Sequence, residues 1–132
     1  MTEIGMKIIL EMEYESALDA VTEALKAEGF GVLTEIDVKA TFKKKLDEDF
    51  RPYKILGACN PPLAYKALTG APDAGMLLPC NVTVSQEADS RILVSIIDPL
   101  AMLGFLVDSD LEDVAQEAKE RLSRVAQALA ES

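Results

Sequence analysis

An apolar stripe along the C-terminal segment constrains the fold of this chain more than any other sequence feature. From Ser109 onward, apolar residues recur at intervals of three and four, which is the spacing of one face of an α-helix. Ser109 and Glu112 have the spacing of a capping box at its first turn. The stripe consists of Leu111, Val114, Ala115, Ala118, Leu122, Val125, Ala126 and Leu129. Such a helix is about 30 Å long, enough to cross a small sheet, so the rest of the chain is expected to supply one.

The preceding residues have the patterns of five strands and three helices. Alternating or continuous apolar residues predict strands over residues 6–13, 31–36, 53–59, 75–86 and 91–98. Met6, Ile8, Leu10 and Met12 should share one face of the first strand, and Leu78, Cys80, Val82 and Val84 one face of the fourth. The last two strands should form an antiparallel hairpin through the polar turn 87–90.

Capping residues set the expected limits of the first three helices. Ser16, Asp37 and Asn60 are suitable N-caps, and Pro61 suits the first turn of the third helix. Gly29 supplies a left-handed stop after the first helix. The resulting order is β-α-β-α-β-α-β-β-α. It predicts an α+β fold with a single antiparallel-type sheet of about five strands and helices on one face. With 132 residues and 49% hydrophobic content, residues 1–132 are expected to form a single domain.

The composition excludes several classes of function. The chain contains no histidine, which rules out Ser-His-Asp catalysis, HExxH zinc chemistry and haem ligation by histidine. Phosphate-binding loops of the GxxxxGKS/T and GxGxxG types do not occur. A net charge of -10 repels phosphate backbones and anionic lipids, so no nucleic-acid or membrane partner is expected. The basic run Lys43 to Lys45 is followed by acidic residues and is interpreted as a solvated helix face. No apolar run reaches the ~20 residues of a membrane span, so a soluble cytoplasmic protein is expected.

Cys59 and Cys80 are the two cysteines, and each stands close to a proline, in Cys59-Asn60-Pro61 and Pro79-Cys80. One interpretation is that both are small buried apolar residues. The other is a reactive thiolate, because Cys59 precedes a helix N-terminus, where the dipole lowers a thiol pKa. Two thiols fall short of a four-ligand zinc site, although thiolates suit a soft ion such as Cu(I). Asn60 is explained as a helix cap, with direct ligand contact as the alternative.

These cysteine segments resemble the bacterial and archaeal family called domain of unknown function 302. The resemblance rests on Ile55 to Pro61, Leu77 to Val82 and Asp98-Pro99, and it extends over essentially the whole chain. It implies a small α/β domain of the TATA-binding-protein-like type, often a dimer, with no established activity. The positions that match the family signature are Cys59, Asn60, Pro61, Pro79 and Cys80. We take these five as the candidate binding residues.

Three functions remain open from the sequence. The first is a non-enzymatic homodimer that holds a small ligand or partner at one end of the sheet or on the uncharged segment 99–107. The second is a thiol-dependent redox or soft-metal protein, in which Cys59 and Cys80 are close and one is accessible. The third is an enzyme that uses carboxylates or a tyrosine such as Tyr53 or Tyr65. The missing catalytic side chains favour the first, and no cofactor is predicted beyond Cu(I) in the second.

Overall fold

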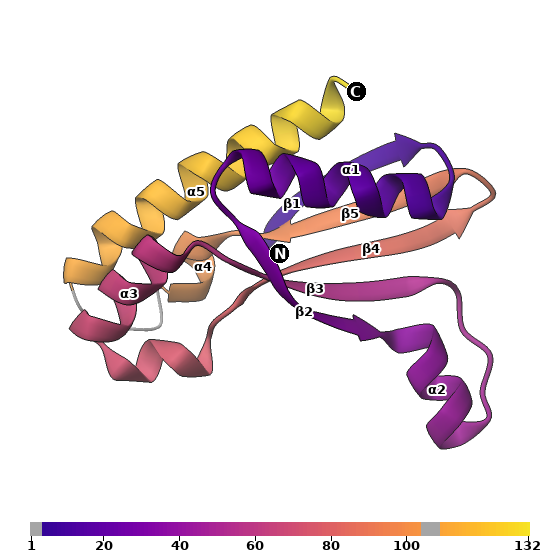
Figure 1. Ribbon diagram of the computed structural model, residues 1–132, viewed down its shortest axis with the longest axis horizontal. Coiled ribbons are helices and arrows are strands. Elements are labelled where there is room, and N and C mark those ends of the chain that lie inside the picture. Colours follow the sequence, from indigo (N-terminus) through magenta and orange to yellow (C-terminus); the bar gives the residue numbers. More distant parts are fainter. Residues whose placement is uncertain (1–3, 104–108) are drawn as a thin grey trace.

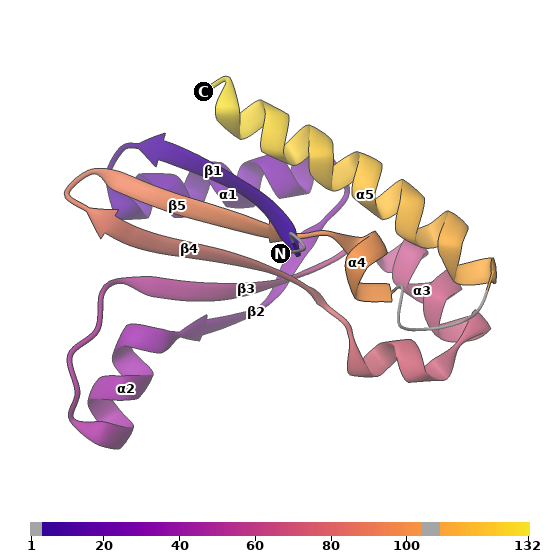
Figure 2. The same ribbon diagram turned by 180° about the vertical axis from the view of Figure 1, so that it is seen from behind.

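The computed structural model describes residues 4–103 and 109–132, and its framework is one five-stranded antiparallel sheet (Figures 1 and 2). The strand order is β1-β5-β4-β3-β2, and every neighbouring pair is antiparallel. The strands are β1 (Gly5–Glu11), β2 (Gly31–Asp37), β3 (Tyr53–Cys59), β4 (Cys80–Ala88) and β5 (Arg91–Ile97). The predicted α+β class with one antiparallel sheet is therefore confirmed.

The helices occupy three positions around this sheet. Helices α1 (Tyr14–Ala27) and α5 (Ser109–Ala130) lie against the same face (Figure 1). Helix α3 (Pro61–Gly70), the 3-10 helix η1 (Pro72–Met76) and α4 (Pro99–Leu103) gather at one end of the sheet. Helix α2 (Val38–Leu46) projects at the opposite end. Among the helices that the structure describes, none has both the length and the apolar character needed to cross a bilayer.

The core lies between the sheet and the pair α1 and α5. On β4, Val82 and Val84 are fully buried while Asn81 is exposed, as the predicted alternation requires, but Ser85, on the same face as Asn81, is buried as well. Leu122 and Val125 on α5 are likewise fully buried, as the apolar stripe predicted. Burying this stripe against the rest of the core stabilises the fold by roughly 25 cal/mol per Å² of apolar surface.

The start of α1 differs from the sequence expectation. The helix begins at Tyr14, its N-cap is Glu13, and no side chain caps it. The predicted cap at Ser16 is therefore wrong. The Tyr14 hydroxyl donates a hydrogen bond of 2.7 Å to the Val84 carbonyl oxygen. A tertiary contact thus anchors the first turn instead of a local cap. At the other end Gly29 adopts φ = 84°, which confirms the left-handed stop.

The fourth strand starts later than its apolar pattern predicted. Residues 72–76 form η1, and β4 begins only at Cys80, so the predicted strand over 75–79 is wrong. Pro79 has no N–H to donate to a ladder, and its peptide bond with Leu78 is cis. The chain enters the sheet one residue after Pro79, at Cys80.

The uncharged segment 99–107 is described only as far as Leu103. Its described part is the short helix α4, in which Pro99 and Leu103 are buried. Asp98 caps this helix, because its Oδ1 accepts a hydrogen bond of 2.9 Å from the Leu100 N–H. Pro99 and Leu103 thus belong to the core, whereas Leu100, Ala101 and Met102 are partly exposed. Residues 104–107 lie outside the described residues. The side chain of Ser109, which belongs to the expected capping box, is not described either.

Helix α2 has the predicted cap but no buried residue. The Asp37 Oδ1 accepts a hydrogen bond of 2.9 Å from the Ala40 N–H. The Phe42 ring packs edge-on against Phe50 with centroids 5.1 Å apart. Lys43 pairs with Asp47 at 3.0 Å in an exposed salt bridge. These contacts support the interpretation of the lysine run as a solvated face.

Candidate functional site

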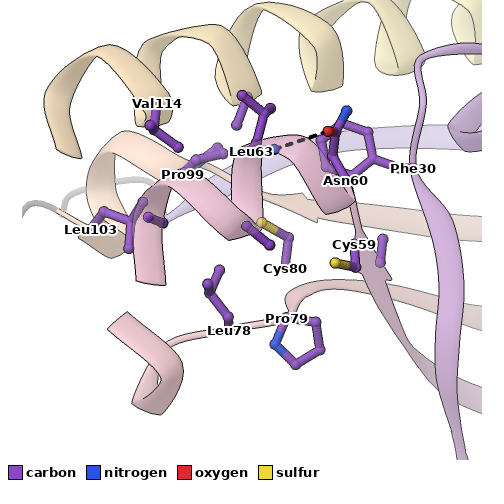
Figure 3. Close-up of a pocket in the computed structure, with 14 residues that line it drawn as sticks. Phe30, Cys59, Asn60, Leu63, Leu78, Pro79, Cys80, Pro99, Leu103 and Val114 are labelled. Carbon is purple, nitrogen blue, oxygen red and sulfur yellow. Dashed lines mark hydrogen bonds between the residues drawn. The ribbon is translucent and has the colours of Figure 1, made fainter. Parts of the chain in front are cut away.

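An apolar cavity lies where β3 ends, β4 begins and α3 starts (Figure 3). We call it the sheet-end cavity. Its volume is about 40 Å³ and its surface is almost entirely apolar. The lining residues are Phe30, Ala58, Cys59, Asn60, Leu63, Ala64, Ala67, Leu78, Pro79, Cys80, Pro99, Leu103, Val114 and Ala118. Four of the five candidate binding residues are among them, and Pro61 is not.

The junction of β3 and α3 sets one wall of the cavity. β3 ends at Cys59, and Asn60 follows as the N-cap of α3, its Oδ1 accepting a hydrogen bond of 3.2 Å from the Leu63 N–H. Asn60 is buried, whereas Pro61 is exposed in the first turn. The cap interpretation of Asn60 is thereby confirmed, and its side-chain oxygen is already engaged within the fold.

The pairing of β3 with β4 brings the two cysteine segments together. Ala58 lies directly opposite Cys80, and Cys59 is the next residue of β3, so the two cysteines lie on adjacent strands with side chains that alternate to opposite faces of the sheet. Both thiols are free and both line the sheet-end cavity (Figure 3). Cys59 is partly exposed and Cys80 is only 6% exposed. Cys59 is therefore partly accessible from solvent, whereas Cys80 is buried.

Burial controls the protonation of both thiols. It raises the pKa of Cys59, and together with the nearby Cys59 it raises the pKa of Cys80 to about 11. Desolvation therefore outweighs any effect of the α3 N-terminus. The expectation of a low-pKa thiolate at Cys59 is wrong, because both groups are neutral thiols at pH 7.

These pKa values predict slow alkylation in the folded protein. With iodoacetamide at pH 7.5, Cys59 should react first, and Cys80 should react only after denaturation, because the thiolate is the nucleophile and Cys80 is buried. The rate at Cys59 should rise through pH 9, since its pKa is raised. Intact-protein mass spectrometry against time gives both rates, and urea-unfolded protein is the control. Faster modification of either cysteine in the folded than in the unfolded chain would contradict this assignment.

Pro79 reaches the cavity because Gly57 leaves room for it. A Cβ added at Gly57 would lie 2.7 Å from the Pro79 Cγ and would also collide with the Thr34 hydroxyl. A glycine inside a strand often marks such a close approach. Gly57 was not among the predicted site residues, although its place in an apolar strand was a usable signal.

Several residues that line the sheet-end cavity could not be recognised as site residues from the sequence. Phe30, Leu63, Leu103 and Val114 come from four separate parts of the chain, and each has the pattern of an ordinary core residue. Their convergence depends on how α3, α4 and α5 meet, which no local motif records.

The other candidate groups lie away from this cavity. Tyr65 is 75% exposed on α3, and the Tyr53 ring lies beside Phe50 with centroids 6.0 Å apart. Within residues 4–103 and 109–132, no group of three or more His, Cys, Asp or Glu side chains is placed to hold a metal ion. The described residues thus offer an apolar cavity lined by two cysteines, with no cluster of acids or bases beside them.

The chain is similar to proteins that are themselves uncharacterised. A family model described as "Domain of unknown function DUF302" matches residues 6–129. The crystal structure of an uncharacterized conserved protein DUF302 from Bacillus stearothermophilus matches with a TM-score of 0.87 and 27% sequence identity. This match covers 97% of the present chain and 99% of the other. No curated protein matches. None of these similarities indicates an activity for the chain.

Proposed function

The chain belongs to the DUF302 family, and from that premise we propose that it is a homodimeric, non-enzymatic binding domain whose ligand site is the sheet-end cavity. The observation that carries the proposal is the convergence of β3, β4, α3, α4 and α5 on one small apolar space. Among the lining residues the only polar side chain besides the thiols is Asn60, whose oxygen caps α3. Such a lining favours binding over acid-base catalysis, which needs a titratable group near the reacting atoms.

The cavity is suited to a small apolar or polarisable group. A buried water needs about 10–15 Å³ and two to four polar partners. The sheet-end cavity has the volume, about 40 Å³, but almost no polar surface to hold water. A ligand that inserts such a group displaces no tightly bound water. It gains dispersion contacts with the residues that line the cavity.

Xenon is the probe that tests this site without knowledge of the natural ligand. Under xenon pressure, the methyl resonances of Leu63, Leu103 and Val114 should shift more than those of Leu25, which is buried but does not line the cavity. Replacing the half-buried Ala64 with leucine should fill the space and abolish the difference.

A matched control for this experiment is Lys66→Leu, at an exposed position on the same helix outside the cavity. It should leave the xenon shifts of the wild type unchanged. Equal shifts at the lining residues and at Leu25 would overturn the cavity as a binding site.

The exposed area of the chain supports the homodimer. The isolated chain exposes 7902 Å². A monomeric protein of 14.3 kDa typically exposes about 6,800 Å². The surplus of about 1,100 Å² exceeds the ~800 Å² that each partner buries in a standard interface. A second copy of the chain would cover an area of about this size.

The surface that we assign to the second copy is the sheet face opposite α1 and α5. Figure 2 views this face, and no helix of the described residues lies across it. Ile9 pairs with Leu93 on this face, and Ile36 pairs with Ile55. Ile9 is 40% and Ile36 is 50% exposed, although both are large apolar residues. They stand on the two edge strands, so each edge of this face carries an exposed apolar residue.

Sedimentation velocity tests this interface. The wild type should sediment as a dimer, and Ile9→Glu or Ile36→Glu should weaken the dimer at least tenfold, because each buries an unpaired charge. Met76→Glu is the control, since Met76 is 78% exposed on η1 at one end of the sheet. A monomeric wild type, or a dimer that both substitutions leave intact, would contradict the assignment.

The proposal includes a cytoplasmic location without a nucleic-acid or membrane partner. Two free thiols, one of them accessible, fit a reducing compartment. The net charge of -10 repels anionic polymers and lipid surfaces.

A further inference from the structure

Helix α2 has an apolar side that the described part of its own chain leaves partly uncovered. Val38, Phe42 and Leu46 recur at every fourth residue and therefore share one side of the helix. None of the three is buried, and Leu46, at the end of this apolar row, is 65% exposed. A helix of nine residues is marginal in water unless its apolar side packs against something. A partner that covers the apolar row would therefore stabilise α2.

The charge of α2 differs from that of the rest of the chain. The helix carries four of the 13 basic residues and none of the 23 acidic ones. At 3.6 residues per turn, Lys39 and Lys45 flank the apolar row on its two sides, whereas Lys44 lies on the opposite side of the helix. Neither Lys39 nor Lys45 forms a salt bridge with the residues that the structure describes. An acidic partner surface therefore complements the apolar side of α2.

We propose that α2 is an arm that packs on a second copy of the chain, with Lys39 and Lys45 facing acidic side chains of that copy. The arm rests on the homodimer proposed above and adds to its interface. A second copy suits α2 because a chain of net charge -10 supplies the opposite charge. It also suits α2 because the helix adjoins the sheet face that we assign to the dimer.

Three aromatic rings join α2 to that sheet face. Tyr53 stands two residues before Ile55 on β3, so their side chains share the face opposite α1 and α5. The centroid of the Phe50 ring lies 6.0 Å from that of Tyr53 and 5.1 Å from that of Phe42 on α2. The arm thus begins where the proposed interface ends, and one partner can cover both.

The acidic residues of the sheet indicate where the arm lands on the partner. α2 stands at the end of the sheet where β1 ends and β4 turns into β5 (Figures 1 and 2). Glu11 ends β1 on the same face as Ile9, and Asp89 is exposed in the turn from β4 to β5. The Glu11 carboxylate has a loose partner in its own chain, Arg91, at 3.9 Å.

Charge also selects the symmetry of the dimer. A two-fold axis along the strands places the β2 edge of each chain over the β1 edge of its partner, with corresponding ends together. Each α2 then lies beside Glu11 and Asp89 of the other copy. An axis across the strands would instead bring α2 over residues 31–34, which include no acidic side chain. The first arrangement pairs opposite charges, so we assign it to the dimer.

The test is a charge swap followed by sedimentation velocity. Lys39→Glu with Lys45→Glu should weaken the dimer at least about tenfold, because like charges then meet at both symmetric contacts. Glu11→Lys with Asp89→Lys should weaken it at least about tenfold for the same reason. An equimolar mixture of the two double variants should form a heterodimer within about threefold of the wild-type affinity, because every facing pair then has opposite charges. A folding defect in either variant cannot produce this recovery.

Two single substitutions on α2 complete the test. Leu46→Ala removes the exposed end of the apolar row and should weaken the dimer at least about threefold. It tests the arm if circular dichroism shows that a charge variant does not fold. Lys44→Glu is the matched control on the far side of the same helix and should change the affinity by less than about threefold.

The outcomes separate the arm from the homodimer. A dimer that the folded Lys39 and Lys45 variant leaves intact, or two weakened, folded variants that do not associate when mixed, would overturn the arm and leave the sheet-face dimer in place. So would lysine-dependent binding of phosphatidylserine vesicles by a dimer that does not need these lysines, because an anionic surface would then be the partner of α2. A monomeric wild type would overturn the arm and the homodimer together.

Discussion

Replacing Leu122 with alanine is expected to lower the free energy of unfolding by about 2–5 kcal/mol. Leu122 is fully buried in the middle of the α5 stripe, which packs against the sheet together with α1. The substitution removes apolar contacts and leaves a cavity that neighbouring elements fill only in part. Urea denaturation followed by circular dichroism measures the change, and the slope of the transition should stay constant.

The matched control is Gln116→Ala, at an exposed position on the same helix. It should change the free energy of unfolding by no more than about 0.5 kcal/mol. A Leu122→Ala effect below about 1 kcal/mol would contradict the assignment of the α5 stripe to the core.

Replacing Gly57 with valine is expected to cost about 1–3 kcal/mol, or more where the backbone must shift. The new Cβ would meet the Pro79 ring and the Thr34 side chain, and neither is the free end of a long flexible chain. The clash should push Pro79 outward and open the sheet-end cavity, because Pro79 is part of its lining. Alkylation of Cys80 in the folded variant should therefore be faster than in the wild type.

Gly31→Val is the matched control in the neighbouring strand. A Cβ at Gly31 meets nothing within 4 Å. The variant should retain wild-type stability within about 0.5 kcal/mol and wild-type thiol reactivity. Equal stability of Gly57→Val and Gly31→Val would show that Pro79 does not depend on the missing side chain of Gly57.

The sequence predicted the parts of the fold that depend on periodicity. The α5 stripe and the alternation in β4 reflect burial of one face, which the order of residues records directly. The caps at Asp37 and Asn60 were predictable because a side chain bonds within its own turn. The start of α1 was not, because the Tyr14 hydroxyl bonds to Val84, far away in the chain.

The candidate site could be predicted only in outline. The cysteine segments drew attention to Cys59 and Cys80, and the register of β3 with β4 places the two residues on adjacent strands at the same end of the sheet. The direction of their pKa shifts could not be predicted, because it depends on how deeply α3, α4 and α5 bury the two thiols. A helix N-terminus is visible in the sequence, whereas the desolvation that outweighs it is a property of the packed cavity.

The central claim is that the sheet-end cavity is a preformed binding site. A crystal held under xenon pressure tests it most directly, because anomalous scattering locates the atom. We predict one xenon atom between Leu63, Leu103 and Cys80, with the surrounding backbone unmoved. Xenon bound elsewhere in the core while α3 closes over an empty sheet-end cavity would contradict the account.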